Sequence, residues 1–178
     1  SFDIGSAAKV NVVQPNSQSV LLNRVLSDNP TQIFGQLNAN GQVVLVNPRG
    51  IVVGSDGSVN TAGFTASALN ISDAEFMQGR YRYVGDGSNG EVLNQGTIRT
   101  APGGYVALLG ASVSNEGQII APQGRRFFKQ VCGDGWITSK LGQGQPPDLG
   151  NQRTGPVQAA GPFGRCQRSF GIAALQLG

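Results

Sequence analysis

The fold is decided by residues 38–54, which read NANGQVVLVNPRGIVVG. Two short apolar runs, Val43–Val46 and Ile51–Val53, are each introduced by an Asn/Gly turn. Between them, Pro48 fixes φ at the first central position of a β-turn, and Gly50 relieves the sterics at its end. Runs of three or four β-branched residues are too short for helices, so the pattern predicts short buried strands joined by tight corners.

The composition of the 178 residues agrees with this plan. The chain has 27 Gly and only 13% charged residues, which disfavours helices and suits many short strands and turns. Nothing approaches 18 consecutive apolar residues, so no membrane span is expected, and no basic-then-apolar leader stands at the start. Histidine is absent, which excludes His-dependent catalysis and most zinc sites. Two cysteines, Cys132 and Cys166, do not make a disulfide framework.

The charge is unevenly distributed along the chain. Residues 1–124 carry six Lys/Arg and eight Asp/Glu, whereas residues 125–178 carry seven Lys/Arg and two Asp. A basic tail is compatible with nucleic acid or an anionic surface. The cations and aromatic residues of this segment do not alternate regularly as a stacking platform would need, so no nucleic-acid partner is expected.

An internal repeat extends the plan beyond the opening stretch. The sequence of residues 94–98, NQGTI, recurs as NEGQI at residues 115–119, a spacing of 21 residues. Each copy is followed by Ala-Pro and then Gly. Self-similarity at about 20 residues is the signature of a solenoid, and the regular leucine framework of leucine-rich repeats is absent.

These features favour a β-helix of about six coils across residues 1–124. Inward Val, Ile, Leu and Ala would stack on the coils above and below at about 4.8 Å. Gly tolerates the corners, and Asn at the same corner of successive coils would form a ladder of side chains. A β-sandwich has similar turns, but the 21-residue recurrence favours the solenoid.

One segment, near 71–85, breaks the pattern. Ser72 is followed three residues later by Glu75 and then by Gly79, which is a capping box with a C-terminal Gly. These residues predict a single helical turn near 73–78. Residues 80–84 then alternate like a half-exposed strand. The sequence therefore predicts an excursion from the solenoid that covers one of its faces.

Several further motifs occur in a fixed order along the first two thirds of the chain. They are FDIG (2–5), SV with LNRV (19–20 and 22–25), QIFG (32–35), LNANGQV (37–43), NPRGI (47–51), LNIS (69–72) and GGYVALLG (103–110). In this set and order the chain resembles the N-terminal secretion domains of two-partner-secretion exoproteins, the filamentous-haemagglutinin-like family.

The resemblance implies an all-β fold, the right-handed parallel β-helix. It also implies one principal partner, an outer-membrane barrel transporter that recognises such domains through its periplasmic POTRA domains. The chain would cross the periplasm and outer membrane to the cell surface or medium, and would template the folding of a passenger of adhesin, haemolysin or contact-dependent-inhibition type. No cofactor is implied.

The secretion motif of the family, Asn-Pro-Asn-Gly-Ile, aligns with Asn47, Pro48, Arg49, Gly50 and Ile51. Arg49 stands where the family has its second Asn, so a role of that Asn side chain does not transfer. The resemblance assigns these residues to transporter recognition or to ordering of the turn. On physical grounds, the Asn47 side chain would bond the turn backbone and Arg49 would project outward.

The resemblance is confined to residues 1–124, which are predicted to form the secretion domain. A capping strand precedes the FDIG match in the family, and its counterpart is expected to be missing from this sequence. Residues 125–178 match poorly and are expected to continue as irregular coils, with GDGWI at 133–137 and 151–159 as the best remaining matches.

Other functions are less consistent with the sequence than the secretion role. Polysaccharide-degrading enzymes also use β-helices, but glycoside hydrolysis needs two converging carboxylates, and here most acids sit singly in turns, as at Asp56, Asp86 and Asp134. Asp56 alone is too little for calcium, and the Gly133-x-Gly135 pair lacks the third glycine of a dinucleotide fingerprint. We therefore expect no enzyme and no metal site; direct adhesion to cells or carbohydrate stays open as an alternative.

The strand-like runs also predict which side chains fill the solenoid. The residues expected to point inward are Val44, Val46, Val52, Ile98, Val106, Leu108 and Ile119. Burial of each is expected to contribute about 1.5–3 kcal/mol to stability.

Overall fold

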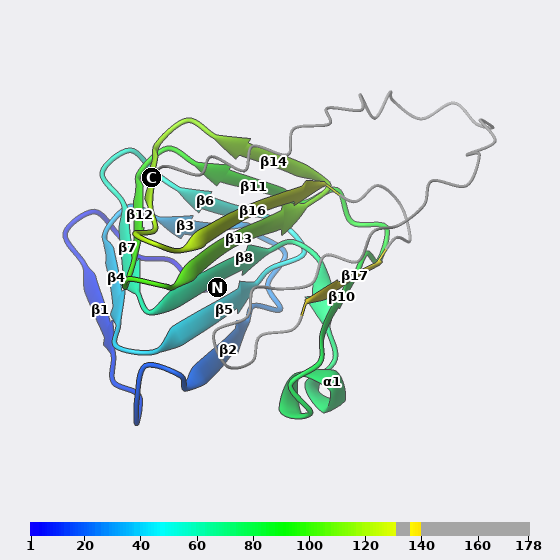
Figure 1. Cartoon of the computed structure of the whole chain (residues 1–178). Helices are drawn as coiled ribbons and strands as arrows, with labels where there is room; N and C mark the ends of the chain where they lie inside the picture. Colours follow the sequence, from blue (N-terminus) through cyan, green and yellow to red (C-terminus); the bar gives the residue numbers. More distant parts are fainter. Residues whose placement is uncertain (131–135, 140–178) are drawn as a thin grey trace.

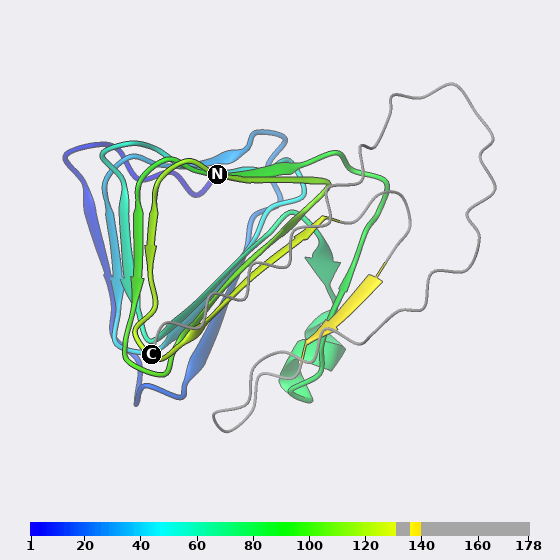
Figure 2. The same ribbon diagram turned by 45° about the horizontal axis from the view of Figure 1, so that its top comes forward.

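The computed structural model describes residues 1–130 and 136–139, and it shows a solenoid of triangular cross-section (Figure 2). Three parallel sheets form its three sides (Figure 1). A small antiparallel sheet and one short helix lie outside the triangle. The predicted parallel β-helix with an excursion is therefore confirmed.

The first side is the β1 sheet, with the strand order β1-β4-β7-β12-β15. Its strands are β1 (Lys9–Val12), β4 (Gln36–Ala39), β7 (Ser58–Thr61), β12 (Thr97–Thr100) and β15 (Gln118–Ile120). All neighbouring strands in it pair in parallel, so each belongs to a successive coil.

The second side is the β2 sheet, ordered β2-β5-β8-β13-β16, and the third is the β3 sheet, ordered β3-β6-β11-β14. The β2 sheet contains β2 (Val20–Arg24), β5 (Gln42–Val46), β8 (Gly63–Ser67), β13 (Tyr105–Gly110) and β16 (Arg125–Gln130). The β3 sheet contains β3 (Thr31–Ile33), β6 (Ile51–Val53), β11 (Glu91–Asn94) and β14 (Ser112–Asn115). A single bridge between Ile4 and Ile33 extends the β3 sheet to the first coil.

Within the described residues the solenoid has five coils, not about six. The repeat seen in the sequence is one coil, since Asn94 pairs with Asn115 and Ile98 pairs with Ile119. The expected number assumed that every stretch of about 21 residues makes a coil. The chain between β8 and β11 instead leaves the solenoid, and this segment is about as long as one coil.

The interior is filled by columns of apolar side chains that run along the solenoid axis. One column consists of Leu37, Val59, Ile98 and Ile119, which are paired in register on four successive strands. All four are buried and belong to one core cluster. Val106 and Leu108 fill the same core from the β2 sheet. The inward orientation predicted for Ile98, Val106, Leu108 and Ile119 is confirmed.

The predicted orientation is wrong for three valines. Val44 and Val46 are fully buried, but they pack in a separate cluster on the outer face of the β2 sheet. Val43 and Leu45 point inward in their place. Val52 is only half-buried, since the strand β6 buries its first and third residues. A strand alternates its side chains, and an uninterrupted apolar run carries no signal that identifies the inward set.

The outer cluster exists because the excursion covers that face (Figure 2). The excursion comprises β9 (Asn70–Ile71), α1 (Asp73–Met77) and β10 (Tyr81–Val84). Strand β10 pairs antiparallel with β9 on one side and with β17 (Trp136–Ser139) on the other. The predicted cap is present, because the Ser72 side chain accepts a hydrogen bond from the Glu75 amide at 3.2 Å. Strand β10 alternates buried and exposed residues as expected.

Asparagine ladders connect successive coils. At a corner, Asn94 Nδ2 donates to Asn115 Oδ1 at 2.7 Å, as the sequence predicted. A second ladder, not predicted, lies along the outer face of the β1 sheet. There Asn60 Nδ2 donates to Asn38 Oδ1 at 3.0 Å, and Asn38 Nδ2 donates to Asn11 Oδ1 at 3.1 Å.

The described part of the chain contains no helix that is long and apolar enough to cross a membrane. Its helix α1 has 5 residues. Cys132, Cys166 and residues 151–159, on which the sequence placed expectations, lie outside the described residues.

Candidate functional site

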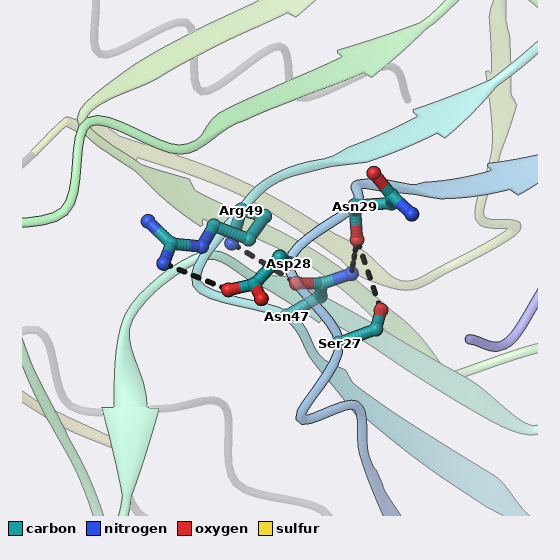
Figure 3. Close-up of polar contacts among 5 residues, drawn as sticks. All are labelled: Ser27, Asp28, Asn29, Asn47 and Arg49. Atoms are coloured by element: carbon teal, nitrogen blue, oxygen red, sulfur yellow. Dashed lines mark hydrogen bonds and ion pairs between the residues drawn. The ribbon is translucent and has the colours of Figure 1, made fainter.

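The motif at residues 47–51 forms the corner where the chain passes from the β2 sheet to the β3 sheet. Strand β5 ends at Val46 and strand β6 begins at Ile51, so four residues make the bend. The Gly50 amide donates to the Asn47 carbonyl oxygen at 2.9 Å, which closes a β-turn. We call residues 47–50 the motif corner (Figure 3).

Asn47 holds the turn together with its side chain. Its Oδ1 accepts a hydrogen bond from the Arg49 amide at 3.0 Å, the two-residue pattern of an Asx-turn. The side chain is fully buried. The predicted bond between Asn47 and the turn backbone is therefore present.

The same side chain also binds the preceding coil, which the sequence did not predict. Asn47 Nδ2 donates to the Asn29 carbonyl oxygen at 3.0 Å and to Thr31 Oγ1 at 3.1 Å. The Asn47 main-chain amide donates to the Ser67 carbonyl oxygen in the following coil at 2.9 Å. Asn47 thus connects three coils, and its amide group uses both of its N–H donors within the protein.

Gly50 occupies a backbone conformation that strains any other residue. Its φ is 118°, a value that L side chains rarely adopt. A Cβ at this position would also lie 2.8 Å from the carbonyl oxygen of Glu91, at the start of β11 in the next coil. The Gly50 carbonyl in turn accepts from the Thr31 amide at 3.0 Å. A side chain here would disturb both the turn and the stacking of the coil above it.

Arg49 is the exposed member of the corner, as predicted. Its guanidinium makes an ion pair with Asp28, with 3.1 Å between Arg49 Nη2 and Asp28 Oδ1. The two side chains are 55% and 94% exposed, so solvent screens the pair and its contribution to stability is small.

Pro48 and Ile51 complete the motif. Pro48 is half-buried, and its carbonyl oxygen packs against Gly90. A Cβ at position 90 would clash with this oxygen. Ile51 is fully buried in the core and pairs with Thr31 below it and Val92 above it. The five motif residues are thus brought together, four of them embedded in the solenoid and one facing solvent.

Sequence reasoning missed the partners of the motif, namely Asp28, Asn29, Thr31, Gly90 and Glu91. They are distant in sequence and have no motif of their own. The one signal available was Thr31, a polar residue two positions before the apolar Ile33 and therefore on the same face of a short strand, since a polar residue at a buried position needs a hydrogen-bond partner.

The arrangement orders the backbone of the turn and presents one cation, Arg49, to solvent. Arg49 pairs with the exposed Asp28. A second carboxylate, Asp86, has its pKa lowered by hydrogen bonds from Ser88 and also by the charge of Arg49. Among the described residues, no group of three or more His, Cys, Asp or Glu could hold a metal ion.

The fold is a parallel β-helix, and the motif corner is embedded in it. A family model described as the TPS secretion domain matches residues 1–155. The chain therefore belongs to the family of two-partner-secretion (TPS) domains, and it is a secretion domain of that class.

Relatives of known identity agree with this assignment. A heme/hemopexin-binding protein of Haemophilus influenzae strain Rd is 37% identical over 136 residues, which is 72% of this chain and 15% of the relative. A second protein of that name from Haemophilus influenzae is 36% identical over 96 residues, which is 54% of this chain and 10% of the relative. The chain thus spans only a small part of the length of these proteins.

A solved structure supports the fold. The HMW1 secretion domain from Haemophilus influenzae is similar with a TM-score of 0.70 and 35% sequence identity. The match covers 78% of this chain and 37% of that one.

Proposed function

We propose that residues 1–124 are the secretion signal and folding template of a larger surface exoprotein, recognised in the periplasm by the POTRA domains of a cognate outer-membrane transporter. Family membership supports the secretion role, and the short span of the relatives that the chain covers supports a longer exported protein. The route across the outer membrane leads to the cell surface or the medium.

The observation that carries the role of the motif is the direction of its bonds. The partners of the Asn47 side chain are Asn29, Thr31 and the Arg49 amide. All of them lie before Gly50 in the chain, so the side-chain bonds of the corner can form without any later coil, and only the main-chain bond from Asn47 to Ser67 waits for the next coil. We infer that the motif corner gives the transporter an ordered structure early in export, with Arg49 presented to solvent.

The test is export of the full-length exoprotein with its transporter, in variants of the corner. Asn47→Ala and Gly50→Val are expected to reduce the amount in the medium, and Arg49→Asn, which restores the residue of the family, is expected to be exported normally. Gly103→Val is the matched control, because Gly103 has a φ of 76° but no atom lies within 4 Å of the position that a Cβ would take.

The unfolding free energy of each purified domain is measured in parallel. Normal export of Gly50→Val despite a destabilised domain would separate export from corner order and contradict the proposal. An export defect of equal size in Gly103→Val would point to a general effect of glycine replacement.

The second candidate is direct binding by this domain, either as an adhesin module or to the ligands in the names of the relatives. Deletion of residues 1–124 distinguishes the two functions, because export fails under the first and only attachment is lost under the second. Heme binding by this domain would lack the most common axial ligand, because the chain has no His. Its single Met, Met77, lies exposed on α1, its three tyrosines are buried, and Cys132 and Cys166 lie outside the described residues. Addition of heme to the purified chain is expected to leave the heme absorption spectrum unchanged.

A further inference from the structure

A shallow groove of about 730 Å³ crosses the outer face of the β1 sheet near the ends of its strands. Four consecutive strands, β1, β4, β7 and β12, contribute to it, and Pro122 after β15 adds the fifth coil. At about 4.8 Å between neighbouring strands, the groove follows the solenoid for about 19 Å. The β1 sheet forms a side of the triangle that the excursion does not cover (Figure 2).

The groove contains the unpredicted asparagine ladder. Asn11, Asn38 and Asn60 all line it, one from each of the first three coils. In the ladder, Asn38 donates one N–H to Asn11 and accepts one hydrogen bond from Asn60. A primary amide has two N–H donors and two acceptor lone pairs, so one donor and one acceptor site of Asn38 remain for a ligand. The ladder also fixes the amide orientation, which reduces the entropy that binding costs.

The charge of the groove has one sign. Among its lining residues, all in the described part of the chain, Arg99 is charged and no Asp or Glu occurs. Arg99 pairs in register with Asn60, so it takes the next position along the line of the ladder. Its side chain is exposed. The remaining lining includes Ala39, Ala62 and Pro102, which offer small apolar surfaces.

We propose that this groove binds an extended acidic polysaccharide, of the uronic-acid class. Regularly spaced amides can hydrogen-bond ring hydroxyls, and the strand spacing is comparable to the length of one sugar ring. The Ala and Pro surfaces match the C–H faces of pyranose rings. Arg99 supplies the charge-assisted hydrogen bond to a carboxylate, which selects an acidic over a neutral chain. This binding is separate from the secretion role, because the groove and the motif corner share no residue.

The test is calorimetric titration of the 178-residue chain with an oligogalacturonate, with a neutral galactose oligosaccharide of equal length as comparison. Arg99→Gln is expected to weaken oligogalacturonate binding about fivefold to tenfold at low salt. Ala101→Glu, at an exposed turn residue of the lining, is expected to abolish binding by placing a carboxylate in the groove. Arg80→Gln, which removes the same charge from the excursion, is the control and is expected to bind like the unmodified chain.

The proposal would be overturned if the unmodified chain did not bind oligogalacturonate, if it bound the neutral oligosaccharide equally well, or if Arg80→Gln and Arg99→Gln weakened binding equally. Tighter binding of a single-stranded oligonucleotide than of oligogalacturonate would also overturn it, because it would indicate a general anion surface. The melting temperature of each variant is measured, and an unchanged value excludes misfolding as the cause of weaker oligogalacturonate binding. Export of Arg99→Gln is expected to be normal, so failure of the polysaccharide-binding proposal would leave the proposed secretion function untouched.

Discussion

Replacement of Asn47 with alanine is the sharpest test of the corner described above. The substitution removes three hydrogen bonds, from Asn47 Nδ2 to Asn29 and Thr31 and from the Arg49 amide to Asn47 Oδ1. A hydrogen bond contributes about 1 kcal/mol net, and a buried partner left unpaired costs more, so the expected loss is about 2–4 kcal/mol. Thr31 is such a partner, because it is fully buried.

The assay is urea unfolding of the 178-residue chain, followed by far-ultraviolet circular dichroism. Asn11→Ala is the matched control, because Asn11 is exposed and its side chain accepts a hydrogen bond from Asn38 at the end of the outer ladder, and its loss is expected to be below about 1 kcal/mol. The reasoning is refuted if the unfolding free energies of the two variants lie within about 0.5 kcal/mol of each other, which would mean that the buried bonds of Asn47 add no more to stability than the exposed bond of Asn11.

Three other expectations follow from the fold. Ile98→Asp is expected to unfold the domain because it buries a carboxylate in the core, whereas Val52→Asp, at a half-buried outward position, is expected to lower the melting temperature only slightly; similar melting curves would mean that the register is wrong. Arg24→Met is expected to loosen the excursion, because Arg24 Nη1 binds Asp73 Oδ1 at 2.7 Å and a second guanidinium nitrogen binds the Ile71 carbonyl. Trypsin should then cleave after the exposed Arg80 several-fold faster than in the unmodified chain. An unchanged cleavage rate would show that these two contacts do not hold the excursion in place. Burial raises the pKa of Tyr83 well above its ordinary value. The folded state therefore keeps a proton that the unfolded chain loses near pH 10, and the unfolding free energy should fall as pH rises above 10. Tyr83→Phe should make this fall less steep, and an identical pH profile of stability would contradict the raised pKa of Tyr83.

The class of fold was predictable because its signals are local and repeated. The 21-residue recurrence indicated the coil, and register pairing of Asn94 with Asn115 shows that the interpretation was correct. The capping box at Ser72 placed the helix, since the cap is formed by residues three apart. Signals of this kind depend on neighbours in the chain and survive without knowledge of the tertiary structure.

The orientation of Val44 and Val46 was not predictable in the same way. Both faces of β5 are buried, one by the core and the other by the excursion, so the sequence shows apolar residues at every position. Alternation identifies an inward face only when the outward face is polar. The turn at the motif was predictable, by contrast, because Asn, Pro and Gly have conformational preferences that do not depend on the surrounding coils. Its partners Asn29 and Thr31 depend on coil stacking and carry no local signal.

The excursion has a geometry that suits protein engineering. The chain leaves the solenoid near Ala68 and returns at Gly90, and these two residues are in direct contact, so that a Cβ at Gly90 would lie 2.8 Å from the Ala68 Cβ. The intervening segment is therefore a closed loop whose ends already meet, and its replacement by another peptide costs little additional loop entropy. Such a graft would uncover Val44, Val46 and Leu109, which the excursion now shields. A display scaffold made from this domain would thus need polar residues at those three positions before a foreign sequence is inserted.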